Sequence, residues 1–281
     1  MPKPIRVAII GAGSSYTPEL LEMMGQMRDR LWIAQLKLQD IDARRLSIME
    51  GFTRRFLKHM GLEVEVITTL EREEAVKDVD FVITQIRVGG NQARILDEKI
   101  PLKYGLLGQE TTGAGGFAKA LRTIPAMLDI ARDVQRVNPK AWIINYTNPT
   151  GIVAEAVTRY TGARIIALCG GGRHPGNMLK KAFGIAHERV RYEYFGLNHF
   201  NFSYHITVDG QPISPEQWRG IAEACGVNPD LTVRMKLLPS LYLPYYHNRT
   251  HKVEALKAAS QTRGQQVLEI EKELIIQIGR A

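Results

Sequence analysis

The chain has 281 residues, of which 44% are hydrophobic and 23% are charged, so it is long enough to fold around a substantial core. Its formal net charge is +8, but basic residues are scattered among acidic ones, which argues against nucleic acid and favours a small anionic ligand. No apolar run approaches the ~20 residues that cross a bilayer, and the N-terminal residues lack a signal-peptide pattern. We therefore expect a cytoplasmic protein with no membrane partner and with Cys169 and Cys225 unpaired.

Strands and helices are predicted to alternate along most of the chain. A β-branched run at residues 4–10 leads into Gly11, and Thr17, Pro18 and Glu19 have the pattern of a helix N-cap and first turn. Further strands are predicted at 35–42, 62–70, 80–90, 141–149 and 163–172, and further helices at 43–60 and 118–137. This alternation predicts a Rossmann-like, doubly wound parallel sheet, whose ligands bind beyond the carboxyl ends of the strands.

The pattern changes near residue 189. An alternating stretch follows, in which Asp209 and Gly210 indicate a hairpin, and helical segments come after it. We predict a Rossmann-like domain at residues 1–188 and an α+β region at residues 189–281.

A turn rich in small residues follows the first predicted strand. Gly11 and Gly13 have the spacing of a dinucleotide fingerprint, but serine or tyrosine replaces its third glycine. Asp40 lies at the end of the second predicted strand, where a carboxylate accepts both ribose hydroxyls of NAD; Asp42 is the alternative. A βα turn without a ligand is the alternative for the whole motif. The predicted NAD-binding residues are Gly11, Gly13, Ser14, Ser15 and Asp40.

Other polar residues lie at the ends of later predicted strands. Arg87 and Arg94 have the planar forks that clamp a phosphate or carboxylate, although an ordered surface loop explains them too. Asn148 can meet nicotinamide or sugar hydroxyls, although Asn-Pro turn chemistry explains it equally well.

Cys169 and His199, with Asn198 beside the histidine, form a candidate metal site. A thiolate and an imidazole suit a divalent metal such as Mn²⁺, with substrate oxygens completing the coordination shell. No spacing rule links the two residues, however, and a buried free cysteine is the simpler interpretation from chemistry alone.

Several motifs together resemble glycoside hydrolase family 4, and in particular its NAD- and metal-dependent 6-phospho-β-glucosidases. They are "GAGSSYTPEL", "DID", "IRVGG", "DEKIPLKYGLLGQETTGAGGFAKALRTIP", "NYTNPTG", "GLNHF", "LPSLYLPYY" and "EIEKEL". The resemblance implies a fold shared with lactate and malate dehydrogenases, a phosphorylated disaccharide or glucoside as substrate, and a homo-oligomer, either a dimer or a tetramer. It also implies that residues 1–188 bind NAD and that residues 189–281 carry the substrate and metal site.

The resemblance also implies roles for individual residues. Oxidation of the sugar at C3 acidifies the C2 proton, the C1 substituent leaves by elimination, and water adds back before C3 is reduced again. Cys169 and His199 match the ligands of Mn²⁺ or another divalent metal, and Tyr242 matches the proposed base, with Tyr245 or Tyr246 as alternatives. Residues that match substrate-side positions are Arg87, Arg94, Asn148 and Asn198.

Two departures from the family pattern keep other functions open. The family's Cys-Asn-x-Pro is here Cys169 followed by three glycines, with Arg173 or His174 as an alternative phosphate ligand, and the chain is shorter than we expect of the family. A catalytically impaired protein that binds NAD or a sugar phosphate is one alternative function. An NAD-dependent dehydrogenase of the lactate/malate type is the other.

Overall fold

The computed structural model describes residues 3–280, of which 172, 173 and 280 are described by their backbone only, so the side chain of Arg173 lies outside this part. The chain forms two compact units. The first contains Met1–Leu168 and Leu256–Ala281, and the second contains Cys169–Ala255. This division differs from the boundary expected at residue 188, because helix α7 (His174–Phe183) packs on strand β7 (Val190–Leu197) of the second unit, whereas helix α12 (Arg263–Arg280) packs on helices of the first.

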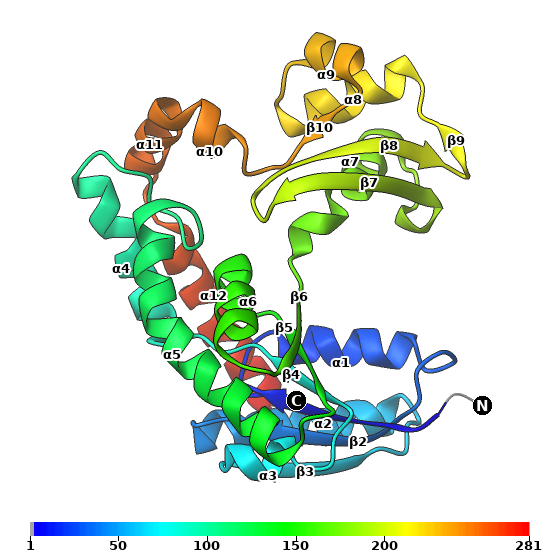
Figure 1. The fold of residues 1–281 in the computed structure, drawn as a ribbon, viewed down its shortest axis with the longest axis vertical. Helices are drawn as coiled ribbons and strands as arrows, with labels where there is room; N and C mark the ends of the chain where they lie inside the picture. Colours follow the sequence, from blue (N-terminus) through cyan, green and yellow to red (C-terminus); the bar gives the residue numbers. More distant parts are fainter. Residues whose placement is uncertain (1–2, 281) are drawn as a thin grey trace. The chain divides into compact units, whose positions relative to one another are not determined.

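The first unit is built on a six-stranded sheet with the order β3-β2-β1-β4-β5-β6 (Figure 1). All neighbouring strands in it are parallel. The strands are β1 (Ile5–Ile10), β2 (Ile33–Gln39), β3 (Glu65–Thr69), β4 (Phe81–Thr84), β5 (Trp142–Asn145) and β6 (Arg164–Ala167). The strand order reverses between β1 and β4, so this sheet has the switch point at which doubly wound folds bind ligands. The predicted Rossmann-like fold is confirmed.

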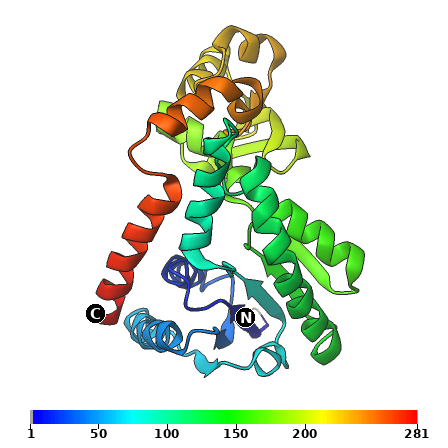
Figure 2. The same cartoon turned by 90° about the vertical axis from the view of Figure 1, so that its left-hand side faces the viewer.

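Helices cover both faces of this sheet, because alternate residues of its central strand are buried on opposite sides. Ala8 and Ile10 of β1 pack with the helices of one face, and Val7 and Ile9 pack with those of the other. The first face carries α3 (Arg72–Val76), α5 (Gly113–Val137) and α6 (Thr150–Tyr160), and the second carries α1 (Thr17–Gln26) and α2 (Ala43–His59). Helix α12, drawn in red in Figure 2, lies beside α2 and α4 (Gly90–Lys103).

Two local expectations are corrected. Residues 90–103, whose composition was also compatible with a surface loop, form helix α4, which begins at Gly90 (φ +63°) directly after its N-cap Gly89 (φ +81°). Thr17 is not an N-cap, because helix α1 already begins there; its buried hydroxyl instead donates a hydrogen bond to the carbonyl of Ala12 at 2.7 Å. That hydrogen bond ties the helix to the turn before it.

The second unit is the predicted α+β region. Its sheet is antiparallel, and β7 and β8 (Phe200–Val208) form its main hairpin. Asp209 and Gly210 have φ values of +50° and +80° and join β8 to β9 (Gln211–Pro212), as their turn chemistry predicts. The remaining elements are η1 (Gly170–Arg173), η2 (His187–Arg189), α8 (Pro215–Cys225), α9 (Pro229–Met235), β10 (Leu238–Pro239) and α10 (Pro244–His247), with α11 (Arg249–Ala258) at its end.

The central sheet provides a test of packing. Ile143 on β5 is fully buried in the core of the first unit, so Ile143→Ala removes apolar contacts and leaves a cavity. We expect the free energy of unfolding in urea to fall by about 2–5 kcal/mol. Ile152→Ala on the exposed side of α6 is the control, with an expected change within about 0.5 kcal/mol. Equal losses in the two variants would contradict this assignment of the core.

Candidate active site

The turn after β1 contains two glycines that allow close packing of its backbone. Gly11 has φ +87°, and a Cβ built on it would lie 3.0 Å from the carbonyl oxygen of Gln85. A Cβ on Gly13 would lie 2.8 Å from Oδ2 of Asp40. A side chain at either position would be strained or would clash, so both glycines let the turn pack closely against Gln85 and Asp40. The N-terminus of α1 beside the turn is a candidate position for a pyrophosphate. Tyr16, the residue before this helix, makes no side-chain capping hydrogen bond.

Asp40, which follows β2, contacts the turn after β1, whereas Asp42 caps a helix. The Asp40 carboxylate accepts hydrogen bonds from Gly13 N at 2.8 Å and from Asp42 N at 3.0 Å, which leaves further lone pairs for ribose hydroxyls. Asp42 caps helix α2 by accepting from two backbone N–H groups of its first turn. The geometry therefore favours Asp40 over Asp42 for the ribose. Ser14 accepts from Tyr16 N at 3.2 Å.

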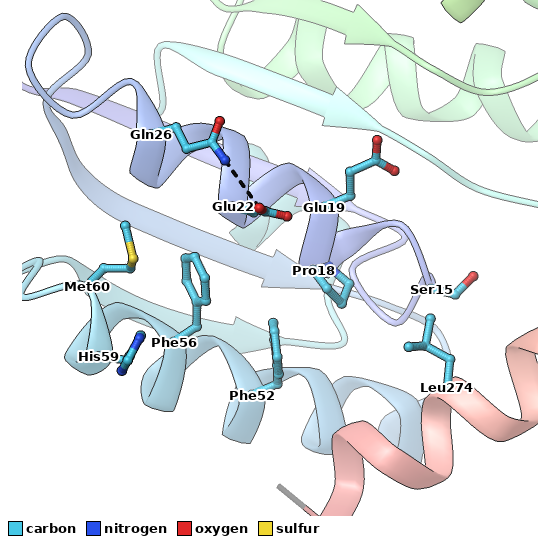
Figure 3. Close-up of a pocket in the computed structure, with 10 residues that line it drawn as sticks. All are labelled: Ser15, Pro18, Glu19, Glu22, Gln26, Phe52, Phe56, His59, Met60 and Leu274. Carbon is cyan, nitrogen blue, oxygen red and sulfur yellow. Dashed lines mark hydrogen bonds between the residues drawn. The ribbon is translucent and has the colours of Figure 1, made fainter.

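Ser15 lines a groove between α1, α2 and α12 (Figure 3). Most of its wall is apolar, and the carboxylates of Glu19 and Glu22 are its acidic groups; Glu22 accepts a hydrogen bond from Gln26 at 3.2 Å. Two carboxylates beside an apolar wall disfavour a phosphate. The groove is therefore not the candidate phosphate site, and the glycine turn remains the candidate.

Arg87 and Arg94 converge on one carboxylate, that of Glu110. Arg87 Nη1 lies 2.8 Å from Glu110 Oε2, Arg94 Nε lies 3.4 Å from it, and Lys119 Nζ lies 2.9 Å from it. Arg94 is only 8% exposed and also pairs with Glu98 at 2.9 Å. Three cations thus surround two carboxylates, and the cluster keeps a positive excess.

The charges in this cluster set the protonation of its members. Burial by itself would raise the pKa of Glu110, but Lys119, Arg87 and Arg94 together outweigh it and lower the pKa to about 2. Burial lowers the pKa of Lys119 to about 8, although Glu110 opposes that shift. Glu110 is therefore a permanent anion near neutral pH, and Lys119 titrates closer to neutrality than an exposed lysine.

Asn148 lies after β5 and is half-buried. Its Oδ1 accepts a hydrogen bond from Thr150 Oγ1 at 2.9 Å, at the start of α6. The neighbouring Asn145 is fully buried and accepts from Thr84 Oγ1 at 2.8 Å, which joins the ends of β4 and β5. Asn148 is thus held near the end of β5. Its hydrogen bond with Thr150 is also one that an Asn-Pro turn makes without any ligand.

In the second unit, Cys169, His199 and Tyr242 come together although they are far apart in sequence. Cys169 Sγ lies 3.9 Å from His199 Nε2, and the His199 ring stacks on Tyr242 with centroids 3.5 Å apart and planes 4° apart. His199 is 5% exposed and has φ +64°, in the tight turn between β7 and β8 that also carries the exposed Asn198. Ser240 supports the arrangement, donating to His199 O at 3.4 Å and accepting from Tyr242 N at 3.3 Å.

This arrangement suits an open metal site. In the part of the chain that the structure describes, no group of three His, Cys, Asp or Glu side chains could hold a metal. A metal held by Cys169 and His199 would have two protein ligands, and substrate oxygens would complete its coordination shell, as in a Lewis-acid site. Tyr245 stacks on Tyr242 at 6.3 Å, whereas Tyr246 packs edge-on against Phe200, so Tyr242 is the tyrosine in contact with the candidate ligands.

Comparison with known proteins identifies the family. Residues 6–184 match the profile described as family 4 glycosyl hydrolase. The chain is 38% identical over 291 residues to a probable 6-phospho-beta-glucosidase of Bacillus subtilis (strain 168), which covers 98% of this chain and 66% of that protein. The chain belongs to glycosyl hydrolase family 4. It is also 39% identical over 207 residues to the phospho-alpha-glucosidase PagL of Clostridium acetobutylicum, covering 73% of this chain and 46% of that protein.

Solved structures agree with this family assignment. The 6-phospho-beta glucosidase of Thermotoga maritima, determined with manganese, NAD+ and glucose-6-phosphate, matches with a TM-score of 0.90 and 33% identity, over 99% of this chain and 68% of that one. Malate dehydrogenase of Plasmodium falciparum matches with a TM-score of 0.59 at 13% identity, over 96% of this chain and 76% of that one, which confirms the dehydrogenase-like fold. The chain thus spans about two thirds of the length of these glycosidase relatives.

No helix within residues 3–280 combines the length and apolarity needed to cross a membrane.

Sequence reasoning missed the residues that organise the charges. Glu110 stood in a polar stretch without an assigned role, and Lys119 was not singled out, although its spacing from Gly115 and Thr123 places it on the buried face of α5. That helical spacing was the available signal, because a lysine on a buried face requires an anionic partner.

The Glu110 cluster predicts a pH-dependent stability. Glu110→Gln leaves its cations without a counter-charge, so we expect the free energy of unfolding at pH 7 to fall by about 3 kcal/mol. Because the folded-state pKa lies below the unfolded one, this contribution is complete above about pH 4.5 and is lost as the pH falls toward 2. Denaturant titrations from pH 7 to 3 measure the effect, with the exposed Glu63→Gln as control. A difference between wild type and variant that does not change with pH would contradict the assignment.

Proposed function

We propose that this chain hydrolyses 6-phospho-β-glucosides with NAD and a divalent metal, Mn²⁺ or a related ion. The observation that carries the proposal is the contact among Cys169, His199 and Tyr242, which brings two candidate metal ligands, a thiol and an imidazole, together with a phenol. A lactate/malate-type dehydrogenase has no use for this group. The family and the bound ligands of the Thermotoga maritima relative support the same reaction.

The cofactor side rests on the first unit. Gly11 and Gly13 leave the backbone open to the pyrophosphate, and Asp40 is placed to accept the ribose hydroxyls. Ser14 and Ser15 complete the turn, and Asn148 is available to nicotinamide or to the sugar. A carboxylate at the ribose favours NAD over NADP, because it repels a 2′-phosphate.

The cations around Glu110 are proposed to bind the phosphate group of the sugar. Arg87 retains more exposure than Arg94, so it is the more accessible cation of the pair. Both share Glu110 as a partner, which holds their guanidinium groups in fixed positions for a 6-phosphate. Asn198 is exposed beside His199 and is proposed to contact a sugar hydroxyl.

The proposed chemistry uses acid–base groups of the protein around a sugar that is transiently oxidised. NAD supplies a hydride acceptor for C3 of the sugar and the metal supplies a Lewis acid for its oxygens. Tyr242 Oη then accepts the acidified C2 proton, and the substituent on C1 leaves by elimination. Cys169 and His199 would hold the metal, which would polarise the sugar's C2 and C3 oxygens. Water would add to C1 as C2 regains its proton, and the hydride taken from C3 would be returned to it, so the reaction would have no net oxidation.

The three glycines after Cys169 give the alternative function its basis. Where the family pattern has an amide, Gly170 presents no side chain. A protein that binds NAD and a sugar phosphate without turnover is therefore the second candidate. The chain's similarity to a phospho-alpha-glucosidase also makes the α-linked substrate a necessary comparison.

The assay that tests the reaction uses p-nitrophenyl 6-phospho-β-glucoside with NAD and Mn²⁺ under reducing conditions. We expect release of nitrophenol that requires both cofactors and falls at least about a hundredfold in Tyr242→Phe, since general base catalysis contributes that much or more. Activity without either cofactor would sink the mechanism. NAD binding without turnover would favour the second candidate, and steady accumulation of NADH with a hydroxy acid would favour a dehydrogenase.

Cys169→Ser tests the metal site. We expect this variant to lose Mn²⁺ binding in calorimetry and Mn²⁺-dependent activity, while its NAD affinity and melting temperature stay near wild type. Cys225→Ser is the matched control, because Cys225 contacts His174 at 3.3 Å and not the candidate ligands. A Cys169→Ser protein that unfolds, or that keeps full activity, would make Cys169 a structural residue.

We also propose a cytoplasmic location and a homo-oligomer, either a dimer or a tetramer. Both cysteines are free, as a reducing compartment requires, and NAD and phosphorylated sugars are intracellular metabolites. Light scattering on the purified chain measures its oligomeric state.

A further inference from the structure

Glu271 on helix α12 bridges two residues from separate helices of the first unit. Its Oε1 lies 2.8 Å from Arg45 Nη2, and its Oε2 accepts a hydrogen bond from Asn91 Nδ2 at 2.8 Å. Arg45 lies on α2, and Asn91 lies in the first turn of α4. The side chain of Glu271 is largely buried, so both contacts are made in a site with restricted access to water.

This bridge reaches the glycine turn. The Nε of Arg45 donates a hydrogen bond to the carbonyl of Gly13 at 2.8 Å, and Gly13 N donates to Asp40. A continuous series of polar contacts therefore runs from the proposed ribose ligand Asp40 to the amide of Asn91. Asn91 is thus linked to the proposed dinucleotide site through Glu271 and Arg45.

Asn91 carries an acceptor that lacks a donor. It is 7% exposed, and its Oδ1 is buried without a hydrogen-bond partner among the described residues. The orientation of its amide is set by chemistry, because a carboxylate only accepts and Glu271 must therefore face the NH₂ group. A buried acceptor left unpaired costs free energy, so Asn91 Oδ1 requires a donor that the described residues do not supply.

We propose that Asn91 Oδ1 accepts a hydrogen bond from a hydroxyl group of the bound dinucleotide and that Glu271 is the residue that positions it. NAD carries ribose hydroxyl donors on both sides of its pyrophosphate, and it is the ligand already proposed for the adjacent turn. The inference thus rests on the proposed NAD binding. It extends the cofactor site from the glycine turn to helices α4 and α12.

Glu271→Gln tests whether Glu271 sets the orientation of the Asn91 amide. The new side chain keeps the shape of the old one, and its oxygen still accepts from Arg45, so its NH₂ group faces Asn91. The Asn91 amide must then turn over to accept from it, and an NH₂ group replaces the acceptor offered to the dinucleotide. We expect the Kd for NAD, measured by calorimetry without sugar, to rise about tenfold or more. Glu273→Gln on the same helix is the matched control, since Glu273 is exposed and accepts a hydrogen bond from Gln277 Nε2 at 3.2 Å.

Asn91→Leu tests the acceptor itself. The substitution removes the amide at similar size, so we expect NAD affinity to fall about tenfold while the melting temperature without NAD stays within a few degrees of wild type. A purely structural role for Asn91 predicts the opposite, a lower melting temperature and an unchanged Kd. That result would overturn the proposal.

NAD binding by the wild type and by the variants separates failure of the proposed function from failure of the proposed role of Asn91. If wild-type protein does not bind NAD, the proposed function fails. If wild type binds NAD and both Glu271→Gln and Asn91→Leu bind it equally well, the proposed function stands and the role of Asn91 and Glu271 is refuted.

Discussion

The hydrogen bond from Gly13 N to Asp40 is the contact on which the organisation of the first unit depends. It draws the turn after β1 against the end of β2 at 2.8 Å, an approach that a side chain on Gly13 would prevent. Arg45 then links the turn to α2, and Glu271 extends the link to α12. Polar contacts thereby join the turn after β1 to the end of β2 and to helices α2 and α12.

The two units stabilise their polar groups in different ways. In the first unit, Arg87, Arg94 and Lys119 surround the buried Glu110, and mutual charge keeps this carboxylate ionised. In the second unit, His199 is buried mainly by ring stacking on Tyr242 and by the tight turn that carries it. Charge pairing holds the first arrangement together, whereas the second brings the sulfur atom of Cys169 within 3.9 Å of His199 Nε2.

Much of the fold follows from the chain's own periodicity. The sequence pattern predicted all six parallel strands. Apolar runs predicted β1 and β4, because buried parallel strands need continuous apolar sequence, whereas alternating apolar residues marked β2 and β3. Helix α4 was not predicted, since Gly89, Gly90 and Pro101 are local signals against helix that packing on α5 and α12 overrides. The return of α12 to the first unit also had no local signal, because an apolar stripe specifies that a helix is covered but not by which partner.

The sequence by itself determined the alternation of strands and helices and the glycines of the turn, since these depend on neighbouring residues. Its resemblance to a known family, and not residue chemistry alone, named the candidate ligands Cys169 and His199. Only the tertiary structure decided that Asp42 caps a helix while Asp40 contacts the turn, that Arg87 and Arg94 share Glu110, and that Cys169 meets His199 and Tyr242. The physical reason is the range of the interactions. Periodicity and capping act over a few residues, whereas hydrogen bonds and ion pairs between distant segments exist only after the sheet, the hairpin and the helices have packed.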